Sequence, residues 1–137
     1  MKRASGKITA SEREVLELLW EQGEALSSSE IVALSENKTW KPSYIHLMIN
    51  SLLKKKIIRV AGFKQTTKNY ARTFEPTMNR EEFSIYILKE ENHMSTKTLS
   101  LLFGTLLEEE TDEKVIEQLS AMVEKRRQEL AKQKETQ

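Results

Sequence analysis

The stretch KPSYIHLMINSLLKKKII, residues 41–58, decides the fold because it joins a buried helical stripe to an unusual outward face. Pro42 suits the first position of a helix, where its missing N–H leaves nothing unsatisfied. Apolar residues then recur at i, i+3, i+4 and i+7, which predicts an amphipathic helix. They are Ile45, Met48, Ile49 and Leu52. The other face is uncharged for two turns and ends in three lysines; it carries Ser43, Leu47, Asn50 and Lys54, flanked by Tyr44 and His46.

Two further helices are predicted before this stretch. Thr9 and Glu12 have the spacing of a capping box at the start of a first helix, which Gly23 would end. Ser27 and Glu30 repeat the box for a second helix, which is expected to end near Asn37. Three short helices are therefore predicted before residue 58.

From residue 57 onward the apolar period changes from helical to alternating. Ile57, Ile58 and Val60 predict a strand, residues 62–69 a polar and basic tip, and residues 69–76 a returning strand closed by Pro76. Three short helices followed by a two-stranded hairpin is the order of a winged helix-turn-helix. We therefore expect a mainly α fold, with a winged-helix DNA-binding domain at residues 1–78.

Residues 79–137 are expected to form a C-terminal helical dimerisation domain. Helices are predicted to start at Asn79, at Ser95 or Thr96, and near Asp112. About 50 residues make a poor monomeric core, so their apolar faces would be buried best against a second copy. The residues assigned to this dimerisation are Leu99, Leu102, Phe103, Leu106, Val115, Ile116, Leu119 and Val123.

The charge is divided between the two halves of the chain. Residues 1–80 carry 14 Lys and Arg against 8 Asp and Glu, whereas residues 81–137 carry 8 against 13. Between Asn37 and Arg80 there are ten basic residues and one acid, Glu75. This asymmetry favours a polyanion-binding module joined to a separate assembly module. A basic face that is merely solvated remains the alternative.

Several classes of function are disfavoured by composition. The chain has no cysteine, which excludes disulfides and thiolate metal sites, and its two histidines, His46 and His93, are too few to indicate zinc. No Ser-His-Asp arrangement, glycine-rich phosphate loop or paired carboxylate is found, so neither an enzyme nor a cofactor or metal is expected. Without an apolar run of about 18 residues or an apolar N-terminal segment, we expect a soluble cytoplasmic protein that does not enter the membrane.

In a helix-turn-helix the third helix enters the major groove of double-stranded DNA, which explains an outward face of amides, hydroxyls and small apolar groups. The predicted base contacts are Ser43, Tyr44, His46, Leu47 and Asn50. The predicted phosphate contacts are Lys41, Lys54, Lys55, Lys64 and Lys68. Two alternatives stay open: Leu47 is a packing residue beside solvated lysines, or the winged helix binds a protein.

Four segments resemble the penicillinase repressor (BlaI/MecI/CopY) family of transcriptional regulators. They are ITASEREVLELLW at residues 8–20, SSSEIV at 27–32, SLLKKKIIRV at 51–60 and EPTMNREEF at 75–83. The resemblance implies a homodimeric repressor that reads operator DNA with its third helix. Family members often carry Lys, Thr, Arg and Thr where this chain has Ser43, Tyr44, His46 and Leu47, so the preferred operator does not carry over.

Two departures from the family concern the inducing signal. The copper-responsive members end in a cysteine-rich metal hook, which a chain without cysteine cannot form. In the penicillinase repressors a sensor protease cuts an Asn-Phe bond in the dimerisation domain. The comparable dipeptide here is Leu102-Phe103, where the Phe matches and the Asn does not. Cleavage at this bond is therefore a hypothesis.

Two other functions compete with a repressor relieved by loss of dimerisation. One is a ligand-responsive regulator of the MarR type, for which an apolar cavity near Tyr86, Phe83 and the wing would be the distinguishing feature. The other is a winged-helix adaptor that binds a protein and ignores DNA even at low salt.

Overall fold

The computed structural model describes residues 4–36, 38–67, 69–92 and 95–136, which belong to two compact units, Met1–His93 and Met94–Gln137. The N-terminal unit holds α1 (Ala10–Gln22), β1 (Leu26–Ser27), α2 (Ser28–Leu34), the 3-10 turn η1 (Pro42–Tyr44), α3 (Ile45–Lys54), β2 (Ile58–Gln65), β3 (Tyr70–Pro76) and α4 (Arg80–Asn92). The C-terminal unit holds α5 (Thr96–Glu109) and α6 (Glu113–Glu135). In the ranges described, none of these helices combines the length and the apolar character needed to span a bilayer.

The starts of α1 and α2 confirm both predicted capping boxes. Thr9 and Ser27 each accept the N–H of the glutamate three residues later, and each glutamate accepts the N–H of its cap. Gly23 ends α1 with a left-handed backbone, φ 66°, as its position predicted. The predicted end of α2 near Asn37 was wrong, because α2 stops at Leu34 and Asn37 itself lies outside the described residues. The Ser35 side chain, at the last turn, donates to the Ile31 carbonyl at 2.6 Å.

One apolar core joins α1, α2, α3 and the base of the hairpin. The stripe predicted on the third helix is confirmed, since its four members are all buried: Ile45, Met48, Ile49 and Leu52. Val15, Leu16 and Ile31 are fully inaccessible and belong to the same cluster. The inner face of α3 is therefore committed to the core, which leaves its opposite face outward.

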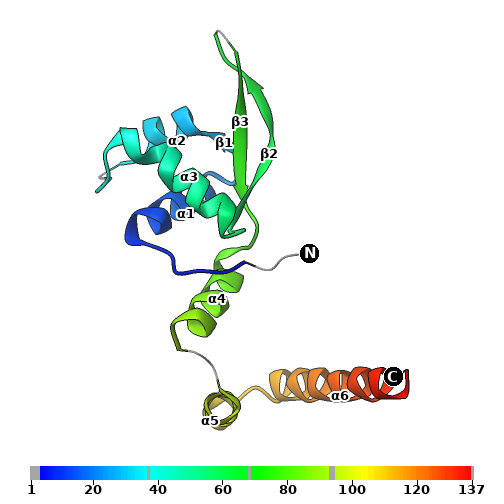
Figure 1. The fold of residues 1–137 in the computed structure, drawn as a ribbon. Coiled ribbons are helices and arrows are strands. Elements are labelled where there is room, and N and C mark those ends of the chain that lie inside the picture. The colour runs from blue at the N-terminus through cyan, green and yellow to red at the C-terminus, as the bar shows by residue number, and fades with distance from the viewer. Residues whose placement is uncertain (1–3, 37, 68, 93–94, 137) are drawn as a thin grey trace. The chain divides into compact units, whose positions relative to one another are not determined.

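The wing is a three-stranded antiparallel sheet with the order β1-β3-β2. The hairpin of β2 and β3 was predicted, but β2 runs as far as Gln65, so part of the expected tip is strand. The two-residue strand β1, which pairs Leu26 with Phe74, was not predicted. Figure 1 shows the hairpin extending well past α2 and α3, and only its base supplies core residues.

The end of α3 is closed by a Schellman motif. The Lys56 N–H donates to the Leu53 carbonyl at 3.1 Å, and the Ile57 N–H donates to the Leu52 carbonyl at 3.0 Å. Leu52 and Ile57 hold the two positions whose apolar contact usually accompanies this motif, and both are fully buried. Lys56 adopts φ 66° at the position where glycine is favoured. The structure therefore keeps a lysine where its backbone is strained.

Replacing Lys56 by glycine is expected to raise the free energy of unfolding by about 1 kcal/mol, because glycine adopts a left-handed backbone without steric cost. The matched control is Lys54→Gly, which lies in the helical part of α3 and should lower stability by about 1 kcal/mol. Urea unfolding followed by circular dichroism measures both changes. Equal destabilisation by the two substitutions would contradict the account of Lys56.

Helix α4 packs on the winged helix rather than apart from it. Phe83 is buried, with its ring centroid 5.3 Å from Trp20. The Trp20 indole N–H donates to the Met78 carbonyl at 2.9 Å, and Arg80 pairs with Glu17 at 3.0 Å. The N-terminal unit therefore includes this helix, which the sequence assigned to the dimerisation domain.

The C-terminal unit consists of two helices with no buried residue in either of them. Their N-caps are Ser95 and Asp112, at the predicted starts. Large apolar side chains on both helices are exposed: Leu99, Leu101, Phe103, Leu106, Met122, Val123 and Leu130. Since water contact with so much apolar surface is unfavourable, this unit has surface available for a partner.

Candidate DNA interface

The outward face of α3 and η1 presents all five predicted base-contact residues to solvent. Ser43, Tyr44, His46, Leu47 and Asn50 are exposed. Leu47 is 66% exposed, which excludes the alternative that it is a core packing residue. Tyr44 is 49% exposed at the last position of η1. Pro42 is the first residue of this 3-10 turn, and the α-helix follows from Ile45. The face offers hydroxyl, amide, imidazole and methyl groups without a charge.

Trp40 anchors the start of this helix and was missed in the sequence. It immediately precedes the N-cap Lys41, and Ile45 stands at the fourth helical position, so the two occupy the places of a hydrophobic staple. Both are buried members of the core cluster. The staple spacing was visible in the sequence and would have found Trp40.

The three lysines that end the helix have different environments. Lys54 is exposed and forms no ion pair with any described residue, as is true of Lys41 at the other end. Lys55 turns inward instead: its Nζ lies 2.7 Å from Glu12 Oε1 and 2.6 Å from the Lys7 carbonyl. The Lys55 side chain is 21% exposed and that of Glu12 only 3%. Lys55 is therefore held by the protein itself.

Glu12 is ionised in this setting. Burial by itself would raise the pKa of Glu12, but hydrogen bonds from Lys55, the Thr9 backbone N–H and Ser51 outweigh burial and lower the pKa below its ordinary value of 4.5. The carboxylate thus serves both the capping box of α1 and the end of α3. The pair fixes the end of α3 to the start of α1.

The wing carries basic and aromatic side chains beyond the core. Lys64 reaches Glu30 at 2.7 Å, and its hydrogen bond is the main reason why the pKa of Glu30 is lowered. Lys68 lies outside the described residues. Phe63 and Tyr70 are 69% and 70% exposed, and neither was predicted as a surface group from the sequence. Lys64 remains solvent-accessible, so an approaching phosphate can compete for it.

The residues assigned to dimerisation all lie in the C-terminal unit. Leu99, Leu102, Phe103 and Leu106 fall on α5, while Val115, Ile116, Leu119 and Val123 fall on α6. None of them is buried. The candidate cleavage bond Leu102-Phe103 lies in the middle of α5, within helical backbone.

Among the residues that the structure describes, no three His, Asp or Glu side chains are grouped so that they could hold a metal ion. The polar groups of the α3 face are instead spread along one helix side, as groove recognition requires.

A comparison with family models identifies the family of the chain. The model of the penicillinase repressor family matches residues 8–125, which covers most of the chain. The chain belongs to the penicillinase repressor family. Members of this family are transcriptional regulators, and the protein is a DNA-binding transcriptional repressor with the predicted mainly helical winged-helix fold.

Similarity to solved structures is more distant. The adhesin competence repressor AdcR of Streptococcus pyogenes matches 90% of this chain and 81% of its own, at 23% identity and a TM-score of 0.39. ZitR of Lactococcus lactis, a zinc-responsive MarR family member, matches 88% of this chain and 77% of its own, at 24% identity and a TM-score of 0.42. The structure of ZitR in complex with DNA matches 91% of this chain and 80% of its own, at 23% identity and a TM-score of 0.41. No curated protein sequence matches the chain.

Proposed function

We propose that this repressor reads operator DNA with one face of η1 and α3 and is a cytoplasmic homodimer. Bases are contacted by Ser43, Tyr44, His46, Leu47 and Asn50. Phosphates are contacted by Lys41 and Lys54 at the two ends of the helix, with Lys64 and Lys68 reaching the backbone from the wing. Lys55, held against Glu12, instead sets the position of α3.

The observation that carries this proposal is the division of α3 into a buried side and an exposed, uncharged side. Four residues of the helix are in the core, while Leu47 and Asn50 face solvent between exposed lysines. Base edges in the major groove are read by amides, hydroxyls and methyl contacts, and phosphates by charge at the periphery. Leu47, near the centre of this face, offers methyl groups that suit contact with a thymine methyl.

Dimerisation is proposed to occur through the C-terminal unit. Its apolar side chains are exposed within the chain, and two helices alone bury too little surface to be stable. A dimer engages two half-sites about one helical turn apart, or a multiple of it. Because the second contact is then intramolecular, affinity rises by roughly 10²–10⁴.

Relief of repression is proposed to act on this unit, with cleavage at Leu102-Phe103 as the candidate event. Such a cut would separate Leu106 and the whole of α6 from the N-terminal unit. The bond is helical, so a sensor protease would need local unfolding of α5. Immunoblotting of the host after β-lactam challenge tests this event, and a chain that stays intact would exclude it.

The experiment that tests DNA recognition is a salt titration of binding to the upstream DNA of the repressor's own gene, with scrambled duplex as competitor. If six to ten phosphates are neutralised per dimer, log affinity should fall with log salt at a slope of roughly −5 to −9. Weak binding that is equal for both duplexes would contradict operator recognition at that site. Absence of DNA binding at low salt would favour a protein-binding adaptor.

Asn50→Ala and Lys54→Gln are expected to weaken binding in different ways. Without Asn50, affinity for the operator should fall by about 1–3 kcal/mol while affinity for scrambled DNA is retained, because a base contact is lost. Without Lys54, both affinities should fall together and the salt slope should decrease by about 1 for each protomer that contacts DNA. Fluorescence anisotropy at several salt concentrations measures both. Parallel losses in the Asn50→Ala variant would remove this residue from the base contacts.

A further inference from the structure

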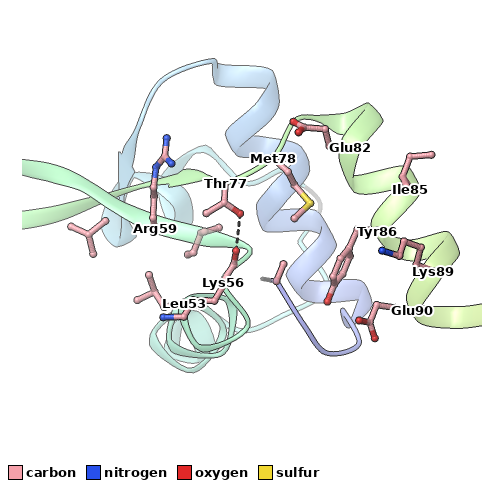
Figure 2. A pocket seen from close by; sticks show the side chains of 13 residues that line it. Leu53, Lys56, Arg59, Thr77, Met78, Glu82, Ile85, Tyr86, Lys89 and Glu90 are labelled. Atoms are coloured by element: carbon pink, nitrogen blue, oxygen red, sulfur yellow. Dashed lines mark hydrogen bonds between the residues drawn. The ribbon is translucent and has the colours of Figure 1, made fainter. Parts of the chain in front are cut away.

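A groove of about 1010 Å³ lies on the N-terminal unit, away from the proposed base-reading face. Its walls come from the end of α3, the start of β2 and one side of α4 (Figure 2). The apolar part is lined by Leu53, Ile58, Val60, Met78 and Ile85. Val60 and Ile85 are 39% and 57% exposed, so apolar surface faces the opening. The volume is that of a site for a small organic molecule.

The cavity named earlier as the mark of a ligand-responsive regulator therefore exists in part. Tyr86 and the base of the wing line it, whereas Phe83 is buried in the core and does not line it. The Tyr86 hydroxyl donates to the Gly6 carbonyl, so its ring is fixed as part of the wall. The shape of the groove is thus set by packing that the fold already requires.

Three cations line this groove, and two of them stand on the β2 side. Arg59 donates one hydrogen bond to Glu75 at 3.0 Å, and its guanidinium keeps further donors. Lys56 is the residue with φ 66°, where glycine would be less strained. Neither Lys56 nor Lys89 is ion-paired with a described residue. Lys56 and Arg59 therefore place two cations beside the apolar wall of the groove.

Two carboxylates on α4 determine which way an amphipathic ligand would lie. Glu82 accepts the Asn79 N–H at 3.0 Å, and Glu90 lies beside Tyr86 on the same helix. Both repel an anionic group from the α4 side of the groove. An anionic group is therefore best placed near Lys56 and Arg59, with its apolar part directed toward Met78 and Ile85.

We propose that this groove is an effector site for a small amphipathic organic anion, such as a carboxylate with an aliphatic or aromatic body. This effector site goes beyond the DNA-reading function. Only the expected effect of the anion on operator binding rests on that function. Lys56 directly follows the Schellman end of the recognition helix, and Arg59 lies in the wing. Thr77 ties these segments together, since its hydroxyl donates to the Lys56 carbonyl at 2.7 Å (Figure 2). A bound anion thus contacts the helix end, the wing and α4 at once.

Binding is tested on the whole protein with decanoate as the probe, below its micellar concentration, by NMR of methionine methyl groups labelled with ¹³C. Met78 lines the groove, and Met122 in the C-terminal unit is 64% exposed and reports non-specific adsorption. The proposal expects a saturable shift of Met78 alone, and none with decyltrimethylammonium. The proposal would be overturned if the Met78 methyl resonance did not shift, as expected when a second copy covers the groove. It would also be overturned if the Met122 resonance shifted equally.

The variants Lys56→Gly and Arg59→Gln should each weaken decanoate binding by about fivefold. Lys56→Gly is expected to fold at least as well as the parent, so its loss cannot be assigned to unfolding. Lys38→Gln removes the same charge outside the groove and should leave decanoate affinity unchanged. Equal losses in all three variants would indicate a general charge effect and overturn the site.

The effector role is tested by operator affinity with and without saturating decanoate. A change of about fivefold or more is expected in the parent, and Lys56→Gly should require about fivefold more decanoate to reach half of that change. Unchanged affinity in the parent would overturn the effector role. Operator binding in the absence of decanoate tests the repressor function separately, so failure of one is distinguishable from failure of the other.

Discussion

Replacing Lys55 by methionine is expected to lower the free energy of unfolding of the N-terminal unit by roughly 2–4 kcal/mol, because it leaves the buried carboxylate of Glu12 without its partner. Methionine keeps most of the aliphatic stem, so the loss reports on the charge. The Nζ group also supports the segment before α1 through the Lys7 carbonyl at 2.6 Å. Urea unfolding of parent and variant measures the difference.

Lys54→Met provides the matched control one position earlier in the chain. Lys54 is exposed and has no ion pair among the described residues, so its replacement should change stability by less than about 0.5 kcal/mol. The same substitution should weaken binding to operator and scrambled DNA together. The two variants then distinguish the roles of these adjacent lysines: Lys55 is needed for stability and Lys54 for the phosphate contact. Equal destabilisation by both would contradict the internal role of Lys55.

The pH dependence of the Lys55→Met effect follows from Glu12. In the parent its pKa is lowered, so its stabilising contribution is complete above pH 4.5 and is lost as the pH falls through the lower, folded-state value. The hydrogen bond and the charge of Lys55 both lower the pKa of Glu12 in the parent, so without them this pKa should be higher than in the parent. On acidification Glu12 is therefore protonated earlier in the variant, which removes the cost of its unpaired buried charge. The stability gap between parent and variant should therefore narrow as the pH falls from 7.

Local rules made most of the fold readable in the sequence. Capping boxes at Thr9 and Ser27, the left-handed stop at Gly23 and the helical period of Ile45 to Leu52 each depend on residues close in the chain. The strand β1 was not readable, because two residues become a strand only when Phe74 pairs with Leu26 from 48 positions away. The packing of α4 depends in the same way on the distant contact of Phe83 with Trp20.

The candidate site was readable in its residue types but not in its partners. Exposure of Leu47 and Asn50 followed from the helical period, since the opposite side had to be buried. Three consecutive lysines have the same chemistry in the sequence, and only folding separates them. Lys54 faces solvent, Lys55 meets Glu12 from 43 positions away, and Lys56 adopts a left-handed backbone.

Leu106→Lys is expected to abolish the proposed dimer and to lower affinity for a two-half-site operator by roughly 10²–10⁴, because the intramolecular second contact is lost. Leu106 is 54% exposed within the chain and lies on the α5 stripe with Leu99, Leu102 and Phe103. A lysine there would put an unpaired charge into an apolar interface. Sedimentation equilibrium and electrophoretic mobility shifts measure the two consequences.

Leu101→Lys is the matched control, since Leu101 lies on the opposite side of α5 and is 72% exposed. The charge change, the residue type and the helix are the same, so a dimer that persists in this variant places the interface on the Leu106 side. DNA with a single half-site adds the second control. Both variants should bind it as the parent does, because the α3 face is unaltered. A Leu106→Lys protein that remains dimeric would instead move the interface away from this stripe of α5.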